Sequence, residues 1–200
     1  MLAFLLQDGT LNLLNLNARS VAGFPLLFNL PVSNRLLLEG GPGFDYEHRL
    51  VMLTDGGELV KVNLQGKLLV REQIGVRLPS ASYSLCADRW RPDAWLVARQ
   101  DNRQISFYDQ QARLMFEHYY PSRNQKTVQF FDFGPLRSII AVTDAATGQC
   151  YLHLPNGQLL DQGPLEFSGE VIVRYSSTAH AYIITGPFGK TLKEVYLQGI

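Results

Sequence analysis

The residues best suited to bind another molecule form one short cluster, Asp88-Arg89-Trp90-Arg91-Pro92-Asp93. A tryptophan flanked by two arginines can stack on a ligand, or it can anchor a protein partner through its large ring. The competing interpretation is a surface loop in which the arginine and aspartate side chains pair with one another. We predict that Asp88, Arg89, Trp90 and Arg91 take part in binding.

Two further polar residues, Asp132 and Arg174, are candidates for a ligand or partner site. Together with Asp88 they fall on, or directly after, segments that we expect to form the innermost strands of the fold, where they would line a central channel. Polar residues are also ordinary in a water-filled channel, so the alternative is that they face only solvent. A weaker patch of the same kind as the tryptophan cluster comprises Tyr119, Tyr120, Arg123 and Lys126.

Two short segments match part of a catalytic motif, but the other segments that such a motif requires are missing. Asp132-Phe133-Gly134 matches the magnesium tripeptide of kinases, yet no glycine-rich loop or His-Arg-Asp segment accompanies it. The stretch 186–191 ends in Gly-Lys-Thr but lacks the first glycine of a nucleotide-binding loop, and we expect a hairpin turn there. The sequence shows no nucleophile with an adjacent base and no metal-ligand spacing of histidines. We therefore predict no catalytic residue, no metal, no cofactor and no enzymatic activity.

Charge and composition exclude several classes of function. The 200 residues carry 18 Lys+Arg and 18 Asp+Glu, so no basic excess favours a nucleic acid backbone. No stretch reaches the roughly 18 apolar residues of a membrane span. The apolar start at 1–6 has no basic segment before it, so we interpret it as a strand rather than a signal peptide. Cys86 and Cys150 are expected to be buried apolar side chains, with a disulfide or a metal site as the alternatives.

Five segments of the chain can be aligned with one another, and this repeat predicts the fold. Each is a strand-like stretch that ends in a turn, and their starts are roughly 45 residues apart, the period of a β-propeller blade. The segments are 10–18, 58–66, 104–112, 149–157 and 191–199.

The residues around each segment predict a blade of antiparallel strands. A run rich in Val, Ile and Leu precedes every segment and is typical of a central strand buried on both faces. An Asp-Gly or similar turn joins this apolar run to the aligned segment that follows it. A looser outer strand follows four of the segments, and an inner strand precedes four of the central runs. The outer strands are expected over 20–26, 67–73, 113–120 and 158–165. The first blade thus lacks an inner strand and the last lacks an outer one. The blade units are expected at about 1–26, 32–73, 80–120, 128–165 and 170–200.

We therefore expect a single all-β, propeller-like domain over 1–200, with about four to five blades. Because the chain starts within a blade, we expect it to be the C-terminal part of a longer protein. Its open blade edges would then bind upstream blades, a protein partner or another copy of the chain. The loop 39–48, rich in Gly and Pro, is expected at a rim of the fold.

The stretch 8–17, followed by Gly23-Phe24-Pro25, resembles the blade motif of quinoprotein-type bacterial propellers, and the pattern returns more weakly at 55–67. With Phe44-Asp45-Tyr46, the chain is also similar over nearly its whole length to large propeller-repeat proteins of Bacteroidetes-type bacteria, a group with no assigned activity. The outer strands depart from the quinoproteins, which have a docking tryptophan in each, and this argues against quinone binding. The residues found there are Phe24, Val70, Phe116 and Leu165.

The repeat and the resemblance together favour a non-enzymatic scaffold for protein–protein interaction, as one part of a larger exported or cell-surface bacterial protein. The alternative function is a propeller that binds or processes a small molecule or carbohydrate in its central channel. A purely structural spacer is a third interpretation.

Overall fold

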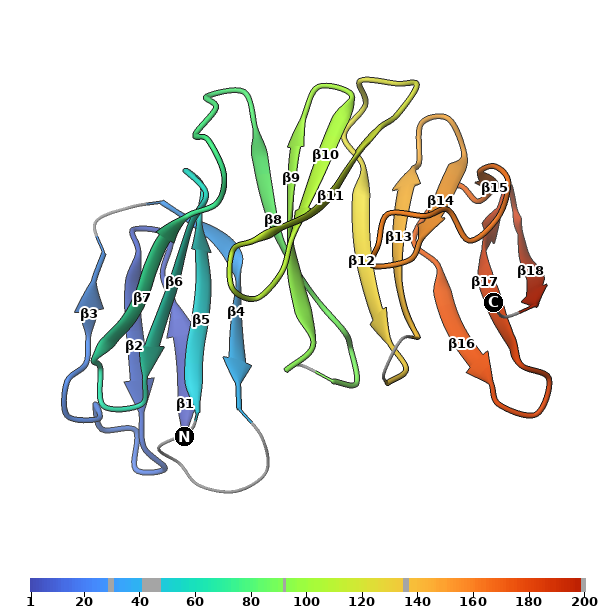
Figure 1. The fold of residues 1–200 in the computed structure, drawn as a ribbon. Coiled ribbons are helices and arrows are strands. Elements are labelled where there is room, and N and C mark those ends of the chain that lie inside the picture. Colours follow the sequence, from blue (N-terminus) through green and yellow to red (C-terminus); the bar gives the residue numbers. More distant parts are fainter. Residues whose placement is uncertain (29–30, 41–47, 92, 135–136, 199–200) are drawn as a thin grey trace. The chain divides into compact units, whose positions relative to one another are not determined.

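The described part of the chain consists entirely of strands, turns and loops. The computed structural model describes residues 1–28, 31–40, 48–91, 93–134 and 137–198. Its 18 strands form five antiparallel sheets, three with four strands and two with three (Figure 1). The prediction of an all-β, propeller-like array is confirmed. Within the described residues the first sheet has no inner strand and the last has no outer strand, as the repeat indicated.

The sheets follow one another along the chain, and in each sheet consecutive strands are neighbours. The two three-stranded sheets are β1 (Leu2–Leu5), β2 (Thr10–Leu14) and β3 (Leu26–Leu27), and β16 (Ile172–Ser176), β17 (Ala181–Phe188) and β18 (Thr191–Gln198). The four-stranded sheets are β4 (Val32–Glu39), β5 (Arg49–Thr54), β6 (Glu58–Asn63) and β7 (Leu68–Gln73); β8 (Ser82–Ala87), β9 (Trp95–Asp101), β10 (Gln104–Tyr108) and β11 (Leu114–Tyr119); and β12 (Thr127–Asp132), β13 (Ser138–Asp144), β14 (Gln149–His153) and β15 (Leu165–Glu166).

An Asn or Asp at the sixth position of the first three aligned segments closes the turn that follows the strand. Asn63 Oδ1 accepts hydrogen bonds from the backbone N–H groups of Gln65 (3.1 Å) and Lys67 (2.8 Å). Asn15 and Asp109 make the same two bonds in their own turns. Short polar side chains of this kind stabilise a turn by bonding the backbone ahead of them. The third residue beyond each is left-handed: Ala18 (φ 56°), Gly66 (φ 77°) and Ala112 (φ 60°).

Gly23 of the Gly-Phe-Pro segment lies against the turn that ends the third strand of the second sheet. Its φ is +91°, and a Cβ there would overlap the carbonyl oxygen of Gln65. The next residue, Phe24, is buried in the core between the first two sheets. The motif that suggested a family resemblance is therefore a packing motif, in which glycine permits two backbones to approach.

We expect Gly23→Ala to reduce the free energy of unfolding by about 2–5 kcal/mol, because it combines a left-handed backbone with a clash against another backbone. Gly148→Ala is the matched control, since Gly148 is also left-handed (φ +68°) but has nothing within 4 Å of its Cβ position. The control should lose only about 1–2 kcal/mol. Denaturant unfolding of both variants measures the difference, and equal losses would contradict the close approach.

The central strands of the four-stranded sheets are buried on both faces, as predicted. In β5, Leu50, Val51, Met52 and Leu53 are all at most 2% exposed. The prediction is wrong for β1, whose residues alternate between exposed and half-buried. The first sheet therefore covers only one of its faces within the described residues.

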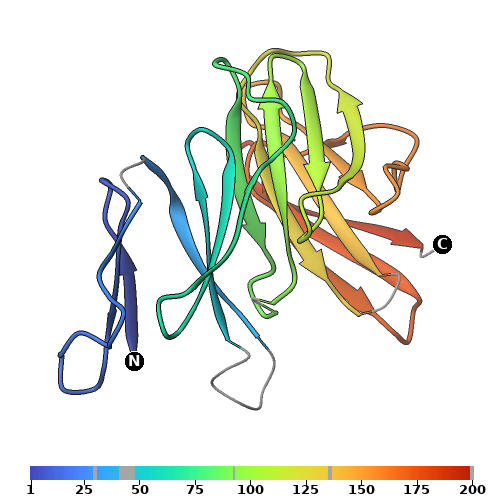
Figure 2. The same cartoon turned by 60° about the vertical axis from the view of Figure 1, so that its left-hand side comes forward.

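Contacts divide the chain into two compact units. Unit 1 comprises 1–101 with 107–114, and unit 2 comprises 102–106 with 115–200, so the division passes through the sheet of β8–β11. In unit 1, one core cluster joins the first sheet to the second, which stand side by side in Figure 2, and another joins the second sheet to β8 and β9. In unit 2, one cluster joins β13 and β14 to β16 and β17.

Two outer strands are shorter than predicted. The outer strands expected over 20–26 and 158–165 reduce to the two-residue strands β3 and β15, each preceded by a single isolated bridge. Pro25 and Pro164 directly precede these strands, and proline cannot donate to a ladder, which explains why pairing begins only after it. Of the loop 39–48 predicted at a rim, residues 41–47 lie outside the described residues.

Candidate functional site

The loop between β8 and β9 is built around the buried carboxylate of Asp88. Its Oδ1 accepts hydrogen bonds from the backbone N–H groups of Trp90 and Arg91, both at 2.7 Å. The Ala94 N–H donates to the Arg91 carbonyl at 2.8 Å, and the Asp88 N–H donates to the Ala94 carbonyl at 2.9 Å. Asp88 is therefore the residue that shapes this loop, and its Oδ1 atom is occupied by the loop's own backbone.

Trp90 projects from this fixed loop with 82% of its surface exposed. The Arg89 guanidinium lies 5.2 Å from the centre of the Trp90 ring, within the range of a cation–π contact. Arg91 takes part in further interactions of its own. The structure thus brings four of the six predicted site residues together, and it leaves the tryptophan ring open for stacking or for insertion into a partner.

Asp132 also holds a turn. Its Oδ1 accepts hydrogen bonds from Ser138 Oγ (2.9 Å) and from the Gly134 N–H (3.2 Å), closing the hairpin between β12 and β13. Gly134 has a left-handed φ of 101°. The Asp-Phe-Gly tripeptide is therefore part of a turn. The Gly-Lys-Thr tripeptide likewise belongs to the β17–β18 hairpin, whose turn lies between Phe188 and Thr191.

Arg174 lies on β16 and bonds within its own sheet. Its Nη2 is 2.9 Å from Glu194 Oε2, which also accepts a bond from Thr185 Oγ1 at 3.1 Å. The hydrogen bond from the Tyr196 hydroxyl to Glu194 Oε1 (2.6 Å) is the largest of several contacts that lower the pKa of the Glu194 carboxyl. Asp132 and Arg174 are thus engaged in separate local contacts, and their assignment to a channel site stays a prediction.

The weaker patch predicted around two tyrosines and two cations is only partly a surface. Tyr119 is 71% exposed and Arg123 is exposed, but Tyr120 and Lys126 are buried. The prediction of a four-residue patch is therefore wrong for Tyr120 and Lys126. Both belong to interior networks that the sequence did not indicate.

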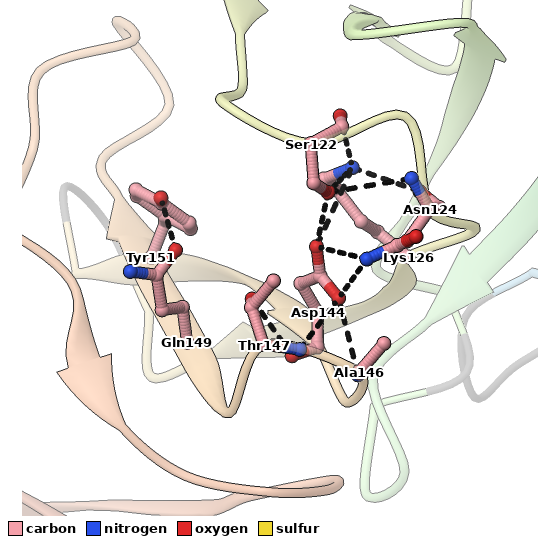
Figure 3. Close-up of polar contacts among 8 residues, drawn as sticks. All are labelled: Ser122, Asn124, Lys126, Asp144, Ala146, Thr147, Gln149 and Tyr151. Carbon is pink, nitrogen blue, oxygen red and sulfur yellow. Dashed lines mark hydrogen bonds and ion pairs between the residues drawn. The ribbon is translucent and has the colours of Figure 1, made fainter.

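The Lys126 network ties the β11–β12 linker to the turn after β13 (Figure 3). Lys126 Nζ donates to the Asn124 carbonyl (2.8 Å), the Ser122 carbonyl (3.1 Å) and Ser122 Oγ (3.2 Å), and it lies 3.9 Å from Asp144 Oδ2. Asp144 accepts bonds from Ser122 Oγ, from Asn124 Nδ2 and from the backbone N–H of Thr147. A buried cation and a buried carboxylate are tolerated here because each is richly hydrogen-bonded.

These bonds also set the protonation states of the network. Burial lowers the pKa of Lys126, and the nearby Asp144 opposes this shift. Burial alone would raise the pKa of Asp144, but the hydrogen bonds from Ser122, Asn124 and Thr147 outweigh it and lower that pKa below 3.8. Asp144 is therefore a carboxylate at neutral pH.

A serine beside a lysine and an aspartate could suggest nucleophilic catalysis, but the bonding opposes it. A general base for Ser122 would need a free lone pair on Lys126 or a carboxylate with a raised pKa. Lys126 uses its N–H groups as donors to three acceptors, and the Asp144 pKa is lowered. The network therefore acts as a structural connection between the linker and the hairpin.

We expect Asp144→Asn to cost about 3–5 kcal/mol of unfolding free energy, because it leaves the Lys126 charge buried without its partner. Glu58→Gln is the control. It removes a carboxylate that is 3.0 Å from Arg71 in a pair that is partly exposed to solvent, so it should cost less than about 1 kcal/mol. Similar losses in the two variants, measured by denaturant unfolding, would show that the buried pair has no special role.

His153 is a second buried polar group in unit 2. Its Nε2 lies 2.9 Å from the Tyr120 hydroxyl and its Nδ1 lies 3.4 Å from the Gly157 carbonyl oxygen. Because Nδ1–H can donate to the carbonyl while Nε2 accepts from the hydroxyl, the neutral ring satisfies both nitrogens. Burial, with a smaller effect of His118 at 4.7 Å between ring centres, lowers the pKa of His153 to about 4.

This shift predicts a pH-dependent stability. The folded pKa of about 4 lies below the ordinary 6.5, so between these values the unfolded chain takes up a proton that the folded chain does not. Stability should fall as pH falls through this window. Between pH 7 and pH 4.5, wild type should lose about 2–3 kcal/mol more unfolding free energy than His153→Gln. Equal losses in the two proteins would contradict a buried neutral His153.

The two cysteines are free and buried, as expected. Burial raises the pKa of Cys86 to about 12 and that of Cys150 to about 11. Both therefore stay protonated near neutral pH and are poor nucleophiles.

A polar cavity of about 290 Å³ lies in unit 1 at the ends of β5, β6 and β7. Arg71 on its wall bonds to Glu58, and Gln73 Nε2 donates to the carbonyl oxygens of Gly56 and Gly57. These polar groups of the lining are thus bonded to one another, and Asp55 and Arg77 also lie on the wall.

No protein-family model and no curated protein matches the chain. Its strand arrangement is nevertheless similar to that of solved structures. A structure of BBS1N in complex with ARL6DN has a TM-score of 0.57 and 14% identity, and the match covers 98% of this chain and 59% of that one. Virginiamycin B lyase from Staphylococcus aureus has a TM-score of 0.53 and 8% identity, over 96% of this chain and 68% of that one. A protein of unknown function from Bacteroides caccae has a TM-score of 0.48 and 14% identity, over 93% and 68%.

The chain thus spans only 59% and 54% of the length of the BBS1N chains in two structures of that complex. The described residues contain no helix that is long and apolar enough to cross a membrane. At such low identities the likeness concerns the fold alone, and the fold shared with these structures is that of a β-propeller.

Proposed function

We propose that this chain is a non-enzymatic propeller scaffold that binds a protein partner through the loop Arg89-Trp90-Arg91. The observation that carries the proposal is the exposure of Trp90, 82%, on a loop that the buried Asp88 holds in place. Large aromatic side chains and arginines dominate the energy of protein interfaces, so these residue types suit an interface centre.

The fixed backbone of the loop strengthens this proposal. Binding is weakened when a flexible segment must become ordered, and a loop that is already bonded avoids much of that cost. Two hydrogen bonds to Asp88 and the Arg91–Ala94 bond hold the backbone around Trp90. The Arg89 guanidinium beside the ring further restricts its position.

The comparisons support a role in protein binding without identifying the partner. The structure of BBS1N with a TM-score of 0.57 is of a complex with another protein, ARL6DN. The sequence resemblance to propeller-repeat proteins of Bacteroidetes-type bacteria supports the further proposal that this chain is one part of a larger exported or cell-surface protein.

Trp90→Ala is expected to abolish capture of a specific partner from an extract of the source organism, with captured proteins identified by mass spectrometry. For that partner, affinity should fall by about 30-fold or more, the effect of losing about 2 kcal/mol at an interface hot spot. Phe188→Ala is the control, because Phe188 is another exposed aromatic residue (45%) and belongs to no candidate site. This variant should capture the same partner with the affinity of wild type.

The unfolding free energy of Trp90→Ala should stay within about 0.5 kcal/mol of wild type, since the exposed ring contributes little to the core. Capture of the same proteins with the same affinity by wild type and Trp90→Ala would overturn the proposal.

A further inference from the structure

The polar cavity at the ends of β5, β6 and β7 contains two charged side chains that the fold leaves unpaired. All of its lining residues belong to unit 1. Arg71 and Glu58 on its wall form an ion pair at 3.0 Å. By contrast, the Asp55 carboxylate and the Arg77 guanidinium make no hydrogen bond or ion pair with any residue that the structure describes. One negative and one positive group of the wall are therefore available to a ligand.

The guanidinium of Arg77 lies against the turn between β5 and β6. Its Nη2, Cζ and Nε atoms are 3.5, 3.6 and 3.7 Å from the position that a Cβ of Gly56 would occupy. These nearly equal distances mean that the planar group turns one face toward Gly56. Because a guanidinium donates within its own plane, this contact leaves its N–H groups available to an acceptor.

The loop between β7 and β8, which carries Arg77, is bonded on both sides of this residue. The Ile74 N–H donates to the Gly57 carbonyl at 2.8 Å, and the Ile74 side chain is fully buried. Arg99 Nη1 donates to the Val76 carbonyl at 3.1 Å. The backbone that positions the Arg77 side chain is thus held in place before any ligand binds.

The turn between β5 and β6 holds Asp55 in the same way. The Asp55 N–H donates to the Pro31 carbonyl at 3.0 Å, and the Gly57 N–H donates to the Thr54 carbonyl at 2.9 Å. The Glu58 N–H donates to Thr54 Oγ1 at 2.9 Å. A ligand that contacts Asp55 and the loop after β7 therefore pays little for ordering the backbone.

The rest of the lining and the size of the cavity restrict the ligand. Leu78, Pro79 and Ala81, together with Pro31, give the wall an apolar part. None of the lining residues that the structure describes is aromatic, which argues against a nucleobase. The volume of about 290 Å³ is near the lower limit of ligand sites, about 300 Å³, so the ligand must be small.

We propose that this cavity binds a small zwitterion with an apolar side chain, namely an apolar α-amino acid. The Arg77 guanidinium binds its carboxylate, since the two groups match in a pair of parallel hydrogen bonds. The Asp55 carboxylate accepts hydrogen bonds from its ammonium group, and the apolar part of the wall contacts its side chain.

The paired charges of the wall favour a zwitterion over a simple ion. Asp55 and Glu58 would repel an anion that lacks an ammonium group, and Arg71 and Arg77 would repel a cation that lacks a carboxylate. The cavity shares no residue with the Trp90 loop, so this proposal does not depend on the proposed function.

The test is an NMR titration of the ¹⁵N-labelled chain with L-leucine. We expect saturable shifts of amide signals within residues 54–58 and 77–81. Two analogues each lack one charge: 3-methylbutylamine has no carboxylate, and 4-methylpentanoate has no ammonium group. Each should bind at least about tenfold more weakly than leucine, because it leaves one charged group of the wall without a partner.

Two variants test the two contacts separately. Arg77→Gln should weaken leucine binding at least about tenfold but should not weaken the binding of 3-methylbutylamine. Asp55→Asn should weaken leucine binding to a similar extent but should not weaken the binding of 4-methylpentanoate. Both side chains are exposed, so both variants should stay folded. Arg19→Gln is the matched control, because Arg19 is also exposed but does not line the cavity, and it should bind leucine as wild type does.

The absence of saturable leucine binding overturns the proposal. Equal affinity for leucine and for either analogue also overturns it, as does a leucine affinity that is unchanged in Arg77→Gln or in Asp55→Asn. Trp90→Ala should bind leucine with the affinity of wild type, so a failure of this proposal can be distinguished from a failure of the proposed function.

Discussion

The constraint on which this fold depends is that its central strands are apolar on both faces, so that a single sheet cannot bury them. In β5, Leu50 and Met52 pack with residues of the first sheet, while Val51 and Leu53 pack with residues of β8 and β9. Burying one such side chain is worth about 1.5–3 kcal/mol, so stacking of sheets contributes more than any single polar contact. Each sheet therefore requires a neighbour on both sides, and a sheet without one leaves apolar surface exposed, as β1 does.

Polar side chains shape the connections between these sheets. Asn63, Asp88 and Asp132 each bond to backbone N–H groups shortly after them in the sequence, and each closes a turn. Asp144 does the same for the turn after β13 and also balances the buried Lys126. Unit 1 contains a comparable arrangement, in which buried Lys61 bonds to Glu39 and lies over the Trp95 ring. The aspartates Asp88, Asp132 and Asp144 thus fix the backbone of their turns.

The strands and hairpins could be predicted because their signals are local: an apolar run, a turn former and a repeat. The buried Lys126 could not, because a lysine in a linker of polar residues is normally in solvent, and only the packing of that linker on Asp144 makes it interior. Tyr120 and His153 were missed for the same reason, since they meet across 33 residues of sequence. A signal did exist for Asp88. It follows a strand and precedes a turn, the same context in which Asn15, Asn63 and Asp109 close theirs.

The use of aspartates to fix turns also bears on function. An acid–base site needs a side chain that is free to gain or lose a proton near neutral pH, whereas hydrogen bonds lower the pKa of the Asp109 and Asp144 carboxyls and favour their charged form. Using Asp144 as a base would weaken the bonds that hold its linker, so activity and stability would oppose each other. The exposed Trp90 ring, on the loop that Asp88 holds, is a feature of a different kind. Binding through this ring would require no change of protonation and is compatible with every turn remaining intact.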